Sequence, residues 1–328
     1  MLTKLAEELY VFPLELPDTP LKSLNCYVIR PDDGGRCLLI DSGFRHPRCW
    51  EMLCAGMEEA GLRPENTDVF FTHVHADHTG NGAALHALGC RLFMSATDYA
   101  VFCAAFQGTN TRQVRGVREG MPPALMEELN RTGPVFHYGS PWFPVTELSD
   151  GDLLCYGRYR LRCLLTPGHT VGHMCLYDEA HRLIFLGDHV LFSISPNIVR
   201  TPFMEDALGQ YMESLKKVAA LPVELALPSH RELGSIPLAQ RVDQLLAHHR
   251  RRLDQALAVI GEHGPITAYD VTSRLHWHIR ADSWEDFPLS QKWFAMGETL
   301  AHLDYLCSRG LIVRDKEGPV VLYSLPKT

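Results

Sequence analysis

Four side chains able to bind a metal ion lie within six consecutive residues of this chain. They are His73, His75, Asp77 and His78. Neutral imidazole and carboxylate groups suit zinc and similar divalent ions, and the oxygen donor also admits iron or manganese. In an extended segment, residues two apart project to the same side, so His73 and His75 could bind one ion while Asp77 and His78 face a second. The alternative is a histidine-rich surface turn, which this spacing disfavours.

The residues around this cluster predict the elements that position it. Residues 69–71 form a short apolar run that is typical of a buried strand, and residues 83–88 have the apolar spacing of a helix. The cluster therefore lies on a loop between a strand and a helix. In open α/β sheets, sites form at such loops, beyond the carboxyl ends of the strands.

This cluster resembles the HxHxDH signature of the metallo-β-lactamase fold superfamily, and every ligand position of that signature is matched. The resemblance implies three further ligands, each following an apolar, strand-like run: His169, Asp188 and His230. One implied site consists of His73, His75 and His169. The other consists of Asp77, His78 and His230, and Asp188 bridges the two.

The implied cofactors are two divalent metal ions, for which we expect Zn²⁺, with iron or manganese as alternatives. Two ions about 3.5–4 Å apart can share a hydroxide that attacks a carbonyl or phosphoryl centre. In this mechanism Asp77 is the catalytic residue that orients the nucleophile and accepts its proton. No serine or cysteine nucleophile is required.

Two further residues are candidates for supporting the metal ligands from behind. Asp41 follows the apolar run 37–40, where the resemblance implies a carboxylate that orients a ligand histidine. Its alternative is a turn residue before Gly43. His173 follows the second ligand loop and is equally consistent with a hydrogen-bonded strand histidine. Arg231, where the family commonly has glycine, could bind an anionic substrate or pair with Glu232.

The pattern of strands and helices predicts an α/β (α+β) fold of two domains. Residues 1–235 are expected to form the αββα sandwich that the resemblance implies, with a helical cap insertion at about 97–140. Three aromatic residues of this cap could line a substrate pocket, although packing onto the core is the favoured interpretation. They are Tyr99, Phe102 and Phe106. Arg112, Arg115 and Arg118 recur every three residues. They could contact an anionic substrate, but a solvated face is favoured.

Residues 236–328 predict a second domain with a long helix, two further helices and a hairpin, an order that resembles a winged helix. Its Lys and Arg residues are balanced by Asp and Glu, eleven of each over residues 241–328. Proteins that bind nucleic acids usually carry excess positive charge, because phosphate contacts dominate their affinity. The only basic run is residues 250–252, so we favour packing or homodimerisation over nucleic-acid binding.

Composition agrees with an intracellular enzyme. The net charge of −8 argues against general nucleic-acid affinity. The ten cysteines are scattered and several lie in strand-like runs, which predicts buried thiols in a reducing compartment rather than disulfides. We expect neither a signal peptide nor a membrane span, and a cytoplasmic location.

The resemblance implies a hydrolase that acts on a small molecule. A thioester or other acyl ester is the first choice, in the manner of glyoxalase II. The second is a phosphodiester or RNA, because the family's lactamase-beta-like branch carries a winged helix and includes RNA-cleaving members. A non-catalytic regulatory protein is a distant third, because it would require a missing ligand.

Overall fold

The computed structural model describes residues 1–106, 116–132, 138–234, 236–277, 281 and 283–327. These residues form two compact units, each assembled from three segments. Unit 1 consists of residues 1–107, 134–196 and 214–242, and unit 2 of residues 108–133, 197–213 and 243–328. The sequence placed one boundary near residue 235, and as a domain limit that boundary stays a prediction.

Unit 1 contains two β-sheets. The first has seven strands in sequence order: β1 (Thr3–Ala6), β2 (Leu9–Glu15), β3 (Ser23–Ile29), β4 (Cys37–Ile40), β5 (Thr67–Phe70), β6 (Arg91–Ser95) and β7 (Thr146–Leu148). The second has five in the order β12-β11-β10-β9-β8: β8 (Leu153–Tyr156), β9 (Tyr159–Leu165), β10 (Met174–Asp178), β11 (Leu183–Gly187) and β12 (Leu225–Pro228).

Alternation along the strands packs the two sheets face to face. In β9, Tyr159, Leu161 and Cys163 are buried while Arg160 and Arg162 are exposed, as the two-residue period of a strand requires. The buried side chains pack with residues of the first sheet such as Phe70. The result is the mixed α/β sandwich that the sequence predicted.

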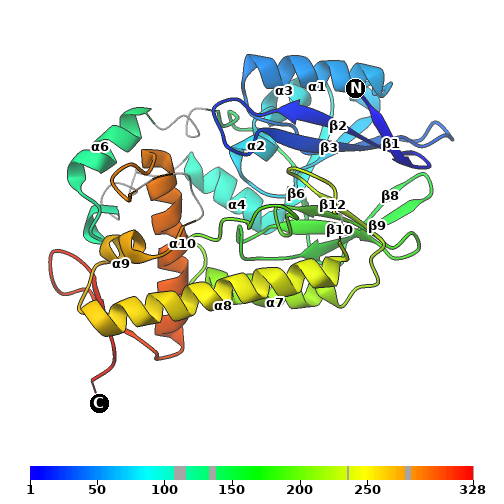
Figure 1. Ribbon diagram of the computed structural model, residues 1–328. Helices are drawn as coiled ribbons and strands as arrows, with labels where there is room; N and C mark the ends of the chain where they lie inside the picture. The colour runs from blue at the N-terminus through cyan, green and yellow to red at the C-terminus, as the bar shows by residue number, and fades with distance from the viewer. Residues whose placement is uncertain (107–115, 133–137, 235, 278–280, 282, 328) are drawn as a thin grey trace. The chain divides into compact units, whose positions relative to one another are not determined.

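Helices cover the outer face of the first sheet. Apolar residues of α1 (Pro47–Glu59), such as Leu53, and of α3 (Gly82–Ala87), such as Leu85, pack on Phe12 and Val69. Figure 1 shows both helices along this face. The segments that connect these strands along the chain also contain η1 (Pro64–Asn66), α2 (Ala76–Thr79) and α4 (Ala96–Ala105).

Parallel pairing sets the edge at which the predicted ligand loops emerge. β4 and β5 run parallel, as do β11 and β12. The loops that leave β5, β11 and β12 therefore start at the carboxyl ends of their strands. In particular, the amide of Ser229 donates to the carbonyl of Gly187 (3.0 Å), which joins the loops after β12 and β11.

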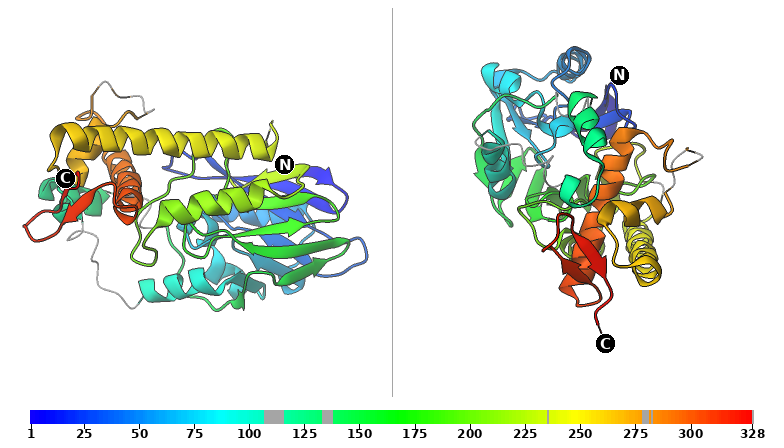
Figure 2. Two further views of the ribbon diagram at one scale, coloured as in Figure 1. Left: turned by 90° about the horizontal axis from the view of Figure 1, so that it is seen from below. Right: turned by 90° about the vertical axis from the view of Figure 1, so that its left-hand side faces the viewer.

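Unit 2 contains most of the C-terminal helices and one hairpin. Its elements are α6 (Pro123–Thr132), α9 (Ala268–Arg274), α10 (Leu289–Ser308) and the antiparallel strands β13 (Val313–Asp315) and β14 (Leu322–Ser324). The hairpin lies beside α10 (Figure 2). Arg314 of β13 donates to the carboxylate of Asp304 in α10 (2.7 Å). Two helices, α7 (Ala207–Ala219) and α8 (Leu238–His263), contribute residues to both units. The predicted order of helices and hairpin is present; its assignment as a winged helix stays a prediction.

A partly buried ion-pair network joins distant segments within unit 2. The guanidinium of Arg200 donates to the carboxylates of Glu119 and Asp304, and the Tyr323 hydroxyl donates to Glu119 (2.9 Å). The amide of Val321 donates to the carbonyl of Arg118 (2.7 Å). These contacts tie residues near 119, which the sequence assigned to a cap over the first domain, to the C-terminal hairpin.

Candidate metal centre

The seven predicted metal ligands converge in unit 1. Their donor atoms gather in three overlapping groups, each within 4.8 Å: His73, His75 and His169; His73, His78 and Asp188; and Asp77, His78 and His230. We call the first group set A and the third group set B. The sequence proposed these same two sets.

The donor atoms of set A lie in close contact. Nε2 of His73 and Nε2 of His169 each lie 3.0 Å from Nδ1 of His75. His73 and His75 follow β5, and His169 lies on the loop after β9. His75 is partly exposed, so solvent reaches this side of the centre.

The donor atoms of set B are held by α2 and by the loop after β12. Nε2 of His230 lies 3.4 Å from Oδ2 of Asp77, and Nε2 of His78 lies 3.7 Å from the same oxygen. The other ring nitrogens are already used. Nδ1 of His78 contacts Oδ2 of Asp41 (2.8 Å), and Nδ1 of His230 donates to the carbonyl of Ser23 (2.8 Å). These bonds occupy both Nδ1 atoms, so the Nε2 atoms are the ones directed toward a metal ion.

Asp188 presents one carboxylate oxygen to each set. Oδ2 lies 3.6 Å from Nε2 of His169 in set A. Oδ1 lies 3.6 Å from Nε2 of His78 and 3.3 Å from Nε2 of His230 in set B. This is the placement required of a carboxylate that bridges two ions.

The buried polar atoms of the centre fit a pair of cations. Nε2 of His78, Nε2 of His230 and Oδ1 of Asp188 are buried and have no hydrogen-bond partner. Such atoms are costly in a folded protein unless a ligand or ion satisfies them. Imidazole nitrogens with two carboxylates suit zinc, iron or manganese, so the donor set fits two divalent ions without selecting one.

Charge differs between the two sets. Burial and the neighbouring rings of His78 and His75 hold the pKa of His73 well below its usual value, so this ring is neutral, as a metal ligand must be. Burial opposes charge on His78 as well, but the carboxylates of Asp41, Asp77 and Asp188 raise its pKa to about 10. A cation bound in set B would replace that proton.

Asp41 lies directly behind the ligands of set B. It is fully buried and adopts a left-handed φ of 62°. Besides contacting His78, its carboxylate accepts hydrogen bonds from the amide of Thr72 (2.9 Å) and the hydroxyl of Ser229 (3.3 Å). These partners belong to the loops that carry His73 and His230, so the position agrees with the predicted support of the ligands.

The ring of His173 contacts the backbone of Asp188. Its Nε2 accepts a hydrogen bond from the amide of Asp188 (3.1 Å), and its Nδ1 contacts the hydroxyl of Thr166 (2.8 Å). The ring is therefore hydrogen-bonded, as one of the two alternatives requires, and a supporting role toward Asp188 stays a prediction.

Sequence reasoning missed Asp98, which lies within the predicted cap. The residue is buried, and its carboxylate accepts hydrogen bonds from the amides of Val74 (2.9 Å) and Gly172 (2.6 Å) and the hydroxyl of Thr170 (2.7 Å). The only local signal is a serine three residues earlier, since Ser95 caps the amide of Asp98 (3.1 Å). That signal predicts a helix start and no contact with the ligand loops.

The aromatic residues of the predicted cap mainly pack. Phe102 is buried against Phe143, and the Tyr99 hydroxyl donates to the Phe143 carbonyl (3.2 Å). Phe106 is 52% exposed. Packing was the favoured interpretation for all three, and the exposed Phe106 departs from it.

The arginine candidates have other partners. The guanidinium of Arg231 donates to the carbonyl of Pro20. Arg118 donates to the carbonyl of Lys316 (2.9 Å). Arg112 and Arg115 lie outside the described residues.

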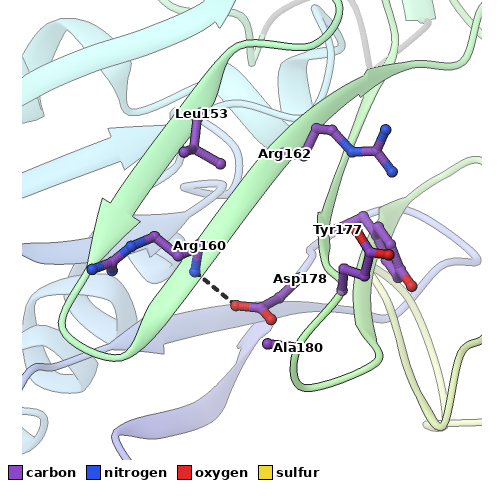
Figure 3. Close-up of a pocket in the computed structure, with 7 residues that line it drawn as sticks. Leu153, Arg160, Arg162, Tyr177, Asp178 and Ala180 are labelled. Atoms are coloured by element: carbon purple, nitrogen blue, oxygen red, sulfur yellow. Dashed lines mark hydrogen bonds between the residues drawn. The ribbon is translucent and has the colours of Figure 1, made fainter.

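A separate surface pocket of about 420 Å³ lies on strands β8–β10 and the turn that follows. Leu153, Arg160, Arg162 and Tyr177 line it together with residues 178–180 (Figure 3). None of the seven predicted ligands lines this pocket, so it is distinct from the metal centre.

Comparisons with known proteins agree with this geometry. Residues 20–230 match the family described as "Metallo-beta-lactamase superfamily", and residues 253–323 match "Metallo-beta-lactamase-like, C-terminal domain". The crystal structure of a metallo-beta-lactamase family protein from Thermus thermophilus is 28% identical and has a TM-score of 0.82, covering 98% of this chain and 100% of that chain. A beta-lactamase domain protein from Burkholderia ambifaria is 26% identical, with a TM-score of 0.84 and coverage of 99% and 94%.

Curated relatives are matched over part of their length. An "Atrochrysone carboxyl ACP thioesterase" from Aspergillus fumigatus is 28% identical over 242 residues, which is 73% of this chain and 60% of the relative. A "Beta-lactamase-like protein 2 homolog" from Caenorhabditis elegans is 29% identical over 177 residues, 54% of this chain and 52% of the relative. The chain thus spans less than two thirds of these relatives.

Proposed function

Because the chain belongs to the metallo-beta-lactamase superfamily, we propose that it is a metal-dependent hydrolase that cleaves a thioester or other acyl ester with water. Sets A and B would each hold one divalent ion, with Asp188 between them. The ions would supply an activated water nucleophile and neutralise the charge that develops on the substrate oxygen.

One observation carries this proposal. The carboxylate of Asp188 directs Oδ2 toward His169 of set A and Oδ1 toward His78 and His230 of set B. A single-ion site would need no such division. A non-catalytic protein, the third interpretation of the sequence, is disfavoured because all seven donors are present and gathered.

Asp77 is the residue placed to handle the proton of the attacking water. Burial disfavours its charge, but the rings of His78 and His230 lower its pKa below the usual range, so it is ionised at neutral pH. Its side chain keeps 11% of its surface exposed. An ionised carboxylate at the edge of the centre can accept a hydrogen bond from water and orient it.

Two lines of support favour an acyl substrate. A relative that aligns with 73% of this chain is named a thioesterase. In addition, the basic run at 250–252 is less basic at the surface than its sequence suggests, because Arg252 is buried and donates to the carbonyl of His276 (2.8 Å). Phosphodiester or RNA cleavage therefore remains the second candidate.

Several finer expectations stay part of this proposal: zinc as the metal, a winged-helix C-terminal domain, a cytoplasmic location, a small-molecule substrate and homodimerisation. No helix among the described residues is long and apolar enough to cross a membrane.

The direct test is substrate profiling of purified protein with known metal content. The panel contains acyl thioesters, lactones and bis-p-nitrophenyl phosphate. We expect thioester hydrolysis that disappears in His75→Ala, because set A loses one of three ligands, while the exposed His86→Ala variant stays active. Full activity in His75→Ala would place the chemistry elsewhere, and turnover of the phosphodiester alone would promote the second candidate.

A further inference from the structure

Asp98 connects the two loops that supply set A. Val74, whose amide donates to Oδ2, stands between His73 and His75 in the sequence. Thr170, whose hydroxyl donates to the same oxygen, directly follows His169. Gly172, whose amide donates to Oδ1, lies on the same loop as Thr170. One carboxylate thus holds both loops from behind.

The contacts of Asp98 differ from those of Asp41. Asp41 touches His78 directly and reaches His73 only through Thr72, whose hydroxyl lies 3.1 Å from Nδ1 of His73. The three donors to Asp98 all belong to the loops of set A. We propose that Asp98 is the positioning residue of set A, which fixes the spacing between the His73–His75 pair and His169. This inference rests on the proposed metal centre.

A role in helix capping does not account for the carboxylate. The start of α4 is capped by the hydroxyl of Ser95, which accepts from the amide of Asp98 and also donates to the carbonyl of Gly172 (2.5 Å). The oxygens of Asp98 point away from the helix, to the two loops. A Cβ on Gly172 would collide with the amide nitrogen of Asp98, so the loop approaches α4 as closely as backbone permits.

The chemistry requires a carboxylate and not an amide. Asparagine has one acceptor oxygen, and its NH₂ group would face at least one of the three donors. Asp98→Asn therefore breaks at least one link and places two donors against each other. Because residues that orient metal ligands typically change metal affinity by about 10–100-fold, we expect a loss of that size at set A.

The test is a titration of the metal-free full-length chain with Zn²⁺ against a chromophoric chelator, repeated with Co²⁺ to follow its absorption spectrum. The wild type should bind two ions per chain. Asp98→Asn should bind one ion with wild-type affinity and the other about 10–100-fold more weakly. Thr170→Val should show a smaller loss at the same ion, and Thr170→Ser, which keeps the hydroxyl, should restore it.

Asp178→Asn is the matched control. Asp178 is also buried in unit 1, and its carboxylate accepts from the amides of Arg160 (2.7 Å; Figure 3) and His181 (2.9 Å). It contacts no ligand loop, so this variant should keep both affinities. If Asp98→Asn does not fold, the Thr170 pair decides the question.

Two outcomes overturn the inference while sparing the proposed function: unchanged affinities in Asp98→Asn and Thr170→Val, or equal weakening of both ions. A wild-type chain that binds no metal overturns both.

Discussion

Two groups of histidines in this protein use their ring nitrogens in different ways. In the metal centre, the Nδ1 atoms of His78 and His230 are bound to Asp41 and to the Ser23 carbonyl, which leaves both Nε2 atoms facing a common space. The second group, which we call the C-terminal histidine cluster, lies in unit 2 and consists of His248, His249, Arg252, Glu298 and His302.

The C-terminal histidine cluster pairs several of its nitrogens with its own members, although Nε2 of His249 is buried without a hydrogen-bond partner. Nδ1 of His302 donates to the carbonyl of Glu298 (2.8 Å), so Nε2 of His302 is an acceptor for Nδ1 of His249 (3.2 Å). Nε of Arg252 lies 3.4 Å from the carboxylate of Glu298. Within the described residues, no three donors of this cluster gather as they do in the metal centre. Residue type alone therefore does not make a metal site; the direction of the unused lone pairs does.

The largest expected effect comes from breaking the bridge of the metal centre. Asp188→Asn leaves one carboxyl-type oxygen to serve two sets of ligands. We therefore expect thioester turnover to fall by more than about 100-fold, which is the upper end of the loss for residues that only orient metal ligands. The measurement is kcat/KM together with metal content per chain. The exposed Asp243→Asn in α8 is the control, and a variant that keeps two ions and full activity would contradict the bridging role.

An intermediate effect is expected from acid on the C-terminal histidine cluster. Burial lowers the pKa of His302 to about 4, and burial with the neighbouring His302 holds the pKa of His249 well below its usual value. The unfolded chain takes up these protons near pH 6.5, whereas the folded chain does not. Stability is therefore full above about pH 6.5 and falls toward pH 4, by about 1.4 kcal/mol per pH unit for each ring.

Urea unfolding of the wild type and of His302→Gln at pH 7 and pH 5 checks this expectation. The wild type should lose more stability between the two pH values than the variant, because the variant lacks one of the rings. The burial of Glu298 opposes its charge, but His248 and His302 lower its pKa to about 2, so its own titration falls below this window. An equal loss in both proteins would show that the cluster is not the source of the acid sensitivity.

The smallest effect is expected for Arg252→Lys. The guanidinium of Arg252 lies 3.9 Å from the ring centroid of Trp277 and donates to the carbonyl of His276. Lysine keeps the charge but not the planar group, so we expect a loss of about 1–2 kcal/mol in the free energy of unfolding. Metal content should not change. The exposed neighbour Arg250→Lys is the control, and equal stability of the two variants would argue against the contact.

The metal centre could be predicted from the sequence because several of its ligands lie close together in the chain. His73, His75, Asp77 and His78 lie within one loop, and the family resemblance supplied His169, Asp188 and His230. Strand periodicity predicted the individual strands, and the resemblance implied that they form a sandwich. Asp98 could not be found in this way, because two of its three partners are backbone amides, which every residue type except proline provides, and its partners on the His169 loop lie 72 and 74 residues away.

The C-terminal histidine cluster escaped prediction for a related reason. His249 and His302 lie on separate helices, 53 residues apart, among ordinary apolar spacings. The grouping of residues 108–133 and 197–213 with the C-terminal segment is likewise set by long-range contacts. Local patterns predict elements, but they do not state which elements pack together.

The interleaved segments of the two units also have a consequence for biosynthesis. Glu119 accepts a hydrogen bond from Tyr323, 204 residues later in the chain. At a translation rate of about 5–20 residues per second, the ribosome needs roughly 10–40 s to make that distance. By residue 242 the emerging chain has all three segments of unit 1 but still lacks the last segment of unit 2, residues 243–328. Glu119 can therefore pair with Arg200 early, but it must wait for the C-terminal hairpin before it can accept the hydrogen bond from Tyr323.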